Sequence, residues 1–151
     1  MEDVVRMLKS KEEILDSINE LFVATDAKEW GRVRAVLAPA VRFDMKSLTG
    51  AEPSTLTPEE IVAAWEKGLR PLAAVHHQTG NFRVRVRGDE ADAFCYGTAT
   101  HYLPNASGRN TRTFVGSYDF RLRRDGEAWR IDQFRFDVKY VDGNLRLEEE
   151  R

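Results

Sequence analysis

Residues 82–103, FRVRVRGDEADAFCYGTATHYL, decide the class of fold. In residues 82–87 apolar side chains alternate with arginines, which is the period of a half-buried β-strand. Gly88-Asp89 is turn material, and residues 91–103 alternate again as a longer strand. Two further alternating stretches, at residues 114–122 and 129–138, flank a hairpin turn centred on Asp125-Gly126. The second half of the chain therefore predicts a meander of antiparallel strands.

The first half has the period of α-helices. Ser10 and Glu13 have the spacing of a capping box, and an apolar stripe follows from Ile14 to Thr25. After this first helix we expect a short helix at 30–37 that Pro39 ends, and then a strand at 41–45. A loop follows at 47–57. Thr57, Pro58 and Glu60 then begin another helix, which stops near Gly68 and Pro71.

Helices followed by antiparallel strands predict an α+β domain, with the helices packed on one face of a curved, mostly antiparallel sheet. The concave face and the helices can then enclose a pocket. A chain of 151 residues has the length of a single domain, 1–151. We expect its core to occupy about residues 11–144 and its charged C-terminal tail to be frayed.

Composition excludes several classes of function. Lys plus Arg total 23 and Asp plus Glu total 25, so a net charge of −2 gives no general attraction to nucleic acid or to anionic membranes. No apolar run approaches the ~18 residues of a membrane span, and no signal peptide is visible, which favours a cytoplasmic protein. The lone Cys95 and three histidines make a poor metal set, and nucleotide-binding glycine motifs are absent. We expect neither a metal nor a cofactor.

Asp26 is the first candidate for chemistry. It lies four residues after Phe22 and so continues the apolar stripe of the first helix, where a carboxylate aimed into the pocket could orient a histidine. Asp26 and Glu29 also have capping-box spacing, so Asp26 could instead cap the next helix. Both interpretations stay open at this point.

Two histidines are further candidates. His76 and His77 are adjacent, so on a strand they point to opposite faces and at most one of them faces the pocket. A pocket histidine can transfer protons near neutral pH, whereas the alternative is a surface histidine. His101 shares a strand face with small residues (Ala93, Cys95, Gly97 and Ala99). These leave room either for a ligand or for a packed helix.

Arginines alternate with apolar residues on the outer side of two predicted strands, at Arg83, Arg85, Arg87, Arg121 and Arg123. The simplest interpretation is a solvated sheet face. Because the helices can cover only the other face and long arginine stems can pack across an interface, we also expect self-association through this sheet.

The order of several short motifs resembles the SnoaL-like branch of the nuclear-transport-factor-2-like superfamily. The motifs are Thr25-Asp26 before Lys28-Glu29-Trp30, Val41-Arg42-Phe43-Asp44, His77-Gln78-Thr79-Gly80-Asn81, Gly88-Asp89-Glu90-Ala91, Gly116-Ser117-Tyr118 and Trp129-Arg130-Ile131. This resemblance implies a cone-shaped fold in which three N-terminal helices and a curved sheet surround a deep pocket.

Within that branch the sequence is similar to scytalone dehydratases, and the resemblance implies a homo-oligomer, either a trimer or a dimer. The resemblance implies catalytic roles for Asp26, His77 and His101, with the first histidine paired to the aspartate. Two tyrosines of that family are replaced here, by Thr25 and Met45. Because those tyrosines hold a water that polarises the substrate, their loss implies a different substrate. We expect Trp65, Cys95 and Ser117 to complete the substrate-binding lining.

The resulting hypothesis is an enzyme that uses histidine–aspartate acid–base chemistry on an apolar cyclic or polyketide-like molecule. The reaction would be a dehydration or other lyase reaction, an isomerisation or a cyclisation, with His77 as base and His101 as acid or water holder. Two alternatives remain, because the fold hosts several functions. One is a ligand-binding or accessory module without chemistry, and the other is the small subunit of a ring-hydroxylating dioxygenase.

Overall fold

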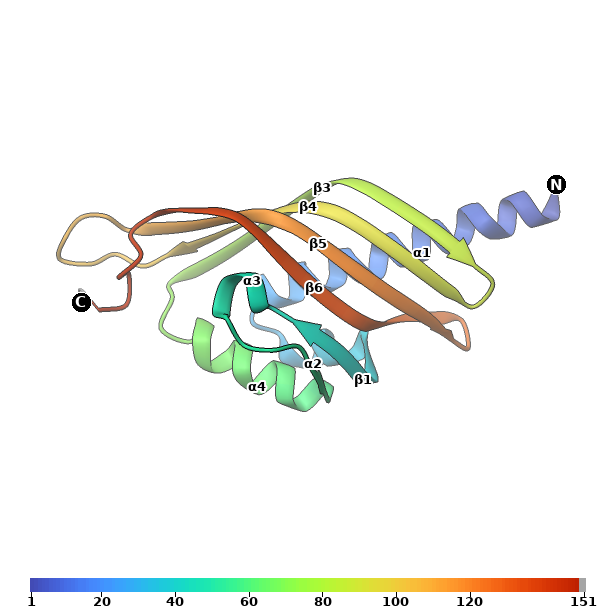
Figure 1. The fold of residues 1–151 in the computed structure, drawn as a ribbon, viewed down its shortest axis with the longest axis horizontal. Coiled ribbons are helices and arrows are strands. Elements are labelled where there is room, and N and C mark those ends of the chain that lie inside the picture. Colours follow the sequence, from blue (N-terminus) through green and yellow to red (C-terminus); the bar gives the residue numbers. More distant parts are fainter. Residues whose placement is uncertain (150–151) are drawn as a thin grey trace.

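A six-stranded sheet with the order β2-β1-β6-β5-β4-β3 is the frame of the computed structural model, which describes residues 1–149 (Figure 1). All neighbouring strands are antiparallel except β1 and β6, which are parallel. The elements in chain order are α1 (Glu2–Asp26), α2 (Trp30–Ala35), β1 (Leu37–Asp44), α3 (Lys46–Thr49), β2 (Ser54–Leu56), α4 (Pro58–Leu69), β3 (Ala74–Arg87), β4 (Glu90–Tyr102), β5 (Thr111–Asp125) and β6 (Ala128–Gly143). The expected α+β architecture is confirmed.

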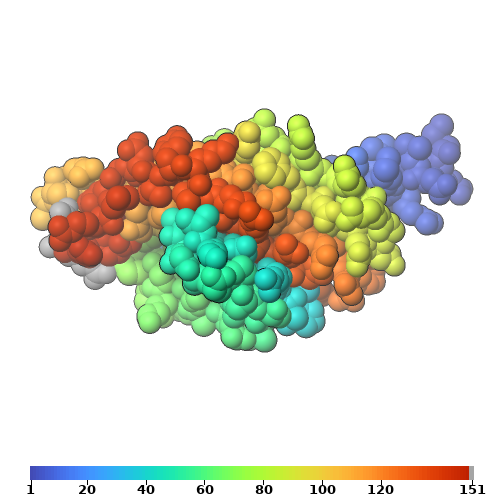
Figure 2. All heavy atoms as spheres, viewed as in Figure 1, coloured from blue at the N-terminus to red at the C-terminus, as the bar shows by residue number. Residues whose placement is uncertain are grey.

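Helix α1 begins eight residues before the expected cap at Ser10, so that boundary was wrong. Ser10 is buried inside the helix, where its hydroxyl accepts a hydrogen bond of 2.9 Å from Arg124 Nη2. Residues 1–9 are exposed, and this end of α1 projects past the sheet (Figure 2, blue). No helix within residues 1–149 combines the length and apolar character needed to span a bilayer.

The segment expected to be a loop at 47–57 instead contains α3 and β2, which is a second correction. Ser47 ties this segment to β6, because its hydroxyl donates to the carbonyl of Phe136 and accepts from the amide of Val138, both at 2.9 Å. The following helix α4 has the expected capping box. The Thr57 hydroxyl accepts from the Glu60 amide, and the Glu60 carboxylate accepts from the Thr57 amide.

Strand β3 changes phase at a bulge. The register with β4 runs from Gly80 opposite Tyr96 to Arg83 opposite Phe94, so two residues on β3 face one on β4. Asn81 in this bulge has a φ of 57°, the left-handed conformation that asparagine tolerates. Because of the bulge, His77 before it and Phe82 after it both face the helices.

The main core lies between the inner face of the sheet and the helices. Its fully buried members come from both layers: Ile14, Ile18 and Leu21 of α1, Val41 of β1, Ile61 of α4, Leu122 of β5 and Ile131 of β6. The alternating arginines lie on the other face, as expected, where Arg121 and Arg123 lie 3.5 and 3.6 Å from the Asp132 carboxylate. Self-association through this face stays a prediction.

The C-terminal tail packs against the domain instead of fraying, as far as residue 149. Gly143 has a φ of 93°, and an added Cβ would lie 2.4 Å from the carbonyl oxygen of Thr111, so the chain turns where only glycine fits. Leu147 is then fully buried against Leu72 and Val75. The expectation failed because this contact is tertiary and leaves no local pattern.

Candidate active site

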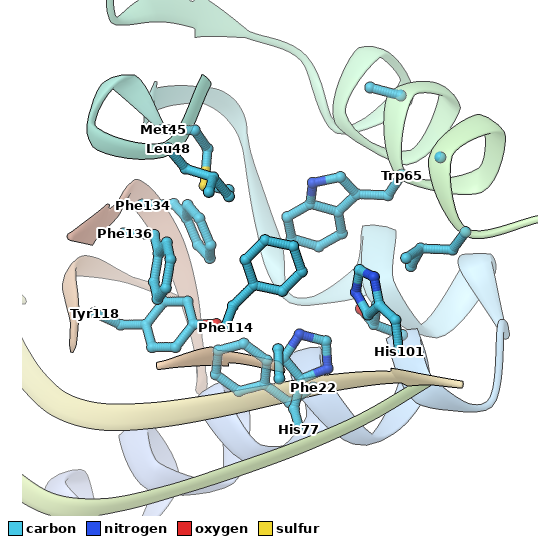
Figure 3. Close-up of a pocket in the computed structure, with 15 residues that line it drawn as sticks. Phe22, Met45, Leu48, Trp65, His77, His101, Phe114, Tyr118, Phe134 and Phe136 are labelled. Atoms are coloured by element: carbon cyan, nitrogen blue, oxygen red, sulfur yellow. The ribbon is translucent and has the colours of Figure 1, made fainter. Parts of the chain in front are cut away.

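A cavity of about 220 Å³ lies between α1, α3, α4 and the inner face of the sheet (Figure 3). Its wall is mainly aromatic and aliphatic, formed by Phe22, Met45, Leu48, Ala64, Trp65, Leu69, Ala99, Phe114, Phe134 and Phe136. The polar groups that reach it are few: Thr25, His77, His101 and Tyr118. An apolar wall with a few polar groups is the usual form of a small-molecule site.

Asp26 and His77 are hydrogen-bonded, as the sequence predicted. Asp26 Oδ1 lies 2.6 Å from His77 Nδ1, and Asp26 Oδ2 accepts from the backbone amide of His77 at 2.8 Å. Since a carboxylate only accepts hydrogen bonds, Nδ1 carries a proton, and a neutral His77 ring then has its lone pair on Nε2. The alternative role of Asp26 is excluded, because the N-cap of α2 is Glu29 and makes no side-chain cap.

The His77 ring is held from its face as well as its edge. Phe22 stacks on it with ring centroids 5.0 Å apart and an angle of 29° between the planes. The neighbouring His76 is exposed on the opposite side of β3. Of the two adjacent histidines, His77 is therefore the one in the site.

His101 enters the cavity from β4, on the same face as His77. The β3–β4 register pairs His77 with Ala99 and Val75 with His101, so the two histidines are diagonal neighbours. His101 Nδ1 lies 2.9 Å from Nη2 of Arg112, the residue directly opposite on β5. Burial, followed by the positive charge of Arg112, lowers the pKa of His101 to about 4.

Thr25 and Met45, the two positions that carry tyrosines in the resembling family, both line the cavity. The buried Thr25 hydroxyl donates to the carbonyl of Leu21 at 2.6 Å, so its proton is used within α1. Trp65 of α4 also lines the cavity and packs against Phe43 and Phe134. These three expected lining residues are in the wall.

A comparison with protein-family models identifies the domain family. The family model described as a SnoaL-like domain matches residues 6–135. The chain belongs to the SnoaL-like domain family. No curated protein matches the sequence.

Solved structures share the SnoaL-like fold over most of their length. The Kfla4162 protein from Kribbella flavida superposes with a TM-score of 0.89 at 24% identity, covering 95% of this chain and 99% of that one. A scytalone dehydratase-like protein from Novosphingobium aromaticivorans superposes with a TM-score of 0.81 at 13% identity, covering 95% of this chain and 92% of that one. A hexachlorocyclohexane dehydrochlorinase from Novosphingobium barchaimii superposes with a TM-score of 0.77 at 14% identity, covering 93% of this chain and 94% of that one. At these identities the likeness shows the fold.

Two expected members of the SnoaL-like pocket do not line the cavity, which corrects the predicted lining. Cys95 is fully buried and is not part of the cavity wall. Burial and, to a lesser extent, the negative charge of Asp119 raise the pKa of its thiol to about 12. Ser117 alternates with the inward-facing Tyr118 and therefore lies on the outer face of β5. The row of small residues on β4 makes room for neighbouring side chains, since the Tyr118 ring occupies the space beside Gly97.

Sequence reasoning missed Arg112 and its partner Glu148. Both oxygens of Glu148 accept from the Arg112 guanidinium, at 2.5 and 2.9 Å. The register of the β4–β5 hairpin would have placed Arg112 beside His101, but nothing local indicates that the tail returns to this point. Among residues 1–149, no group of three or more His, Cys, Asp or Glu side chains is placed to hold a metal ion.

Proposed function

We propose that the protein is a small-molecule lyase or isomerase in which His77 removes a proton from a carbon of an apolar cyclic substrate. The observation that carries this proposal is the Asp26–His77 hydrogen bond of 2.6 Å at the wall of an aromatic cavity. It leaves an unprotonated Nε2 as the base. A positioned base of this kind contributes typically about 10²–10⁴-fold to a rate.

Asp26 has two roles in this chemistry. It holds His77 in the tautomer with the proton on Nδ1, and it stabilises the imidazolium that forms when Nε2 accepts a proton. The electron pair of the broken C–H bond becomes a double bond. In an elimination the leaving group departs with its own bonding pair, whereas in an isomerisation His77 returns the proton to another carbon.

The cavity supports a compact, largely apolar substrate. A volume of about 220 Å³ suits a molecule of one or two rings, and aromatic side chains from four elements surround it. Phe22, Phe114 and Trp65 offer ring faces and edges for stacking, which favours a planar or cyclic ligand (Figure 3).

Two structural neighbours are named for eliminations, a scytalone dehydratase-like protein and a hexachlorocyclohexane dehydrochlorinase. A dehydratase removes water and a dehydrochlorinase removes hydrogen chloride, and both reactions begin or end with loss of a proton from carbon. These names support an elimination as the reaction to test first.

The test uses three probe compounds: a scytalone-like hydroxynaphthalenone, 2-tetralone and γ-hexachlorocyclohexane. Proton removal from the ketones is followed as deuterium uptake from D₂O by NMR, and elimination as product or chloride release. The His77→Asn variant is compared with wild type. His76→Asn is the matched control, because it changes the adjacent histidine on the exposed face.

We expect wild type and His76→Asn to process at least one probe at similar rates, and His77→Asn to be slower by about 100-fold or more. Equal rates in all three proteins would overturn the role of His77. Binding of a probe without exchange or elimination would instead favour the ligand-binding module, and co-purification with a large iron-containing subunit would favour the dioxygenase assignment.

A further inference from the structure

We infer that Arg112, held by Glu148 of the C-terminal tail, is a positioning residue that locks His101 as a neutral hydrogen-bond donor with its proton on Nε2. His101 then acts on a substrate oxygen by donating a hydrogen bond. It does not act as a protonated acid. The inference rests on the proposed function for its meaning in catalysis, but the tautomer can be measured without any substrate.

The tautomer follows from what Arg112 can offer. A guanidinium has five N–H donors, no acceptor and a permanent positive charge, so the nitrogen that faces it must supply a lone pair. That nitrogen is His101 Nδ1, at 2.9 Å from Nη2. The single proton of the neutral ring is therefore on Nε2, the nitrogen left for the cavity that His101 lines.

Glu148 fixes the guanidinium in this position. Its two carboxylate oxygens accept from Nη1 and Nη2, a bidentate arrangement that sets the plane of the guanidinium. The side chain of Arg112 is only 14% exposed, so its guanidinium is largely shielded from water, whereas the Glu148 side chain is 30% exposed. The turn at Gly143 and the burial of Leu147 bring Glu148 to this place.

The electrostatics agree with a neutral His101. A second proton would have to enter between Nδ1 and the guanidinium, and burial already disfavours the charged ring. The charged or titratable groups around it are Arg112, His77, Glu148 and Asp26. The carboxylates of Glu148 and Asp26 raise the pKa of His101, but burial, Arg112 and His77 together lower it to about 4.

The two cavity histidines are thus set in opposite tautomers. His77 presents a lone pair on Nε2 because a carboxylate holds its Nδ1, whereas His101 presents an N–H because an arginine holds its Nδ1. A base beside a hydrogen-bond donor suits a carbonyl compound. Its C–H bond would face His77, and its oxygen, which gains negative charge as the proton leaves, would accept the hydrogen bond from His101. This names enolisable ketones as the substrate class.

Long-range ¹H–¹⁵N correlation NMR of the labelled protein tests the inference directly. The chain has three histidines, and His101→Gln and His76→Gln assign their signals. The double variant Arg112→Met/Glu148→Gln removes the donor without leaving an unpaired charge. Arg112→Lys retains a donor-only cation. Arg85→Met is the matched control, because this exposed arginine lies on the outer face of β3, far along the strand from Val75, against which the tail packs.

We expect wild type, Arg112→Lys and Arg85→Met to carry the His101 proton on Nε2 at pH 7. The double variant should show both tautomers, whereas the pKa of His101 should stay below its usual range, because burial, the largest cause of its lowering, remains. On a ketone that wild type enolises, the same variant should lower kcat roughly tenfold, because a loosened donor stabilises the enolate less well.

Three results would overturn the inference: a proton on Nδ1 in wild type, an unchanged tautomer in the double variant, or the same change in Arg85→Met. The absence of turnover with every probe would overturn the proposed function instead. The tautomer measurement distinguishes these two failures, because it does not depend on activity.

Discussion

Phe22 and Asp26 are one helical turn apart on α1, and both of them hold the imidazole of His77. Phe22 covers the ring face at 5.0 Å between centroids, and Asp26 binds the ring edge at 2.6 Å. A helix places residues i and i+4 on one face, so a single turn of α1 fixes both the plane and the tautomer of the candidate base.

Replacing Phe22 tests the stacking contact. Phe22→Leu should lower the free energy of unfolding by about 1–2 kcal/mol, because it removes a buried ring that also contacts Tyr118 and Phe120. Denaturant titration measures this loss, and the rate of probe turnover should also fall. Phe94→Leu, on the outer face of the sheet, is the control and should leave turnover unchanged. Equal effects of both variants would contradict a specific contact with His77.

Asp26→Asn should invert the His77 tautomer. The amide nitrogen of asparagine is a donor, so a side-chain amide that still accepts from the His77 backbone amide must present NH₂ to Nδ1. The ring proton then moves to Nε2 and the base is lost. We expect kcat/KM to fall by about 10²–10⁴-fold, while the melting temperature changes by only a few degrees. Retained turnover, or a proton that stays on Nδ1 by NMR, would show that Asp26 does not set the base.

Gly97→Ala should disturb the cavity through Tyr118. A Cβ at residue 97 would lie 2.1 Å from Cε2 of the Tyr118 ring, so the ring must shift. We expect a loss of about 1–3 kcal/mol in the free energy of unfolding and weaker binding of cavity ligands. Gly80→Ala on the neighbouring strand is the control, because nothing lies within 4 Å of its added Cβ. Wild-type stability of Gly97→Ala would falsify this prediction.

The stability of the fold should fall with acid in a window set by His101. Its pKa is lowered to about 4 in the folded protein, whereas the unfolded chain titrates near 6.5. Between these values the unfolded state binds more protons, so the stabilising contribution is complete above about pH 6.5 and is lost as the pH falls toward 4. The loss is at most about 3 kcal/mol.

Denaturant titrations of wild type and His101→Gln from pH 7.5 to 4.5 measure this dependence. The wild-type curve should be the steeper of the two. Arg112 also lowers the pKa of Glu148, so the ion pair of the tail is lost only at still lower pH. Parallel curves for the two proteins would mean that His101 titrates normally in the fold.

Elements with a strong internal period could be predicted from the sequence. The capping box at Thr57, the alternation of β5 and the Asp125-Gly126 turn all depend on neighbouring residues, and all are present. The start of α1 was misplaced because the capping-box spacing of Ser10 and Glu13 was taken as the beginning of the helix. Val4, Val5, Met7 and Leu8 also have helical spacing, although they lie exposed outside the core, and no proline or glycine stops the helix there.

The candidate site was partly predictable for the same reason. Asp26 continued the apolar stripe of a helix, and His101 alternated with inward-facing residues of a strand. His77 needed the family resemblance, because the bulge at Asn81 breaks the alternation between it and Phe82. Arg112 and Glu148 are 36 residues apart, and their contact depends on how the tail folds back. No local pattern records such a contact.

The parallel pairing of β1 with β6 has a consequence for how the chain acquires its structure. Leu37 pairs with Ile131, so β1 must wait for almost the whole remaining sequence before its partner is synthesised. Closing so long a loop carries a large entropy cost, and contacts between such distant segments slow folding. During synthesis on the ribosome, β1 can pair with β2 on one side, but its other edge has no partner until β6 emerges. Because an unpaired strand edge is a template for association between chains, fragments that end before residue 128 are expected to aggregate.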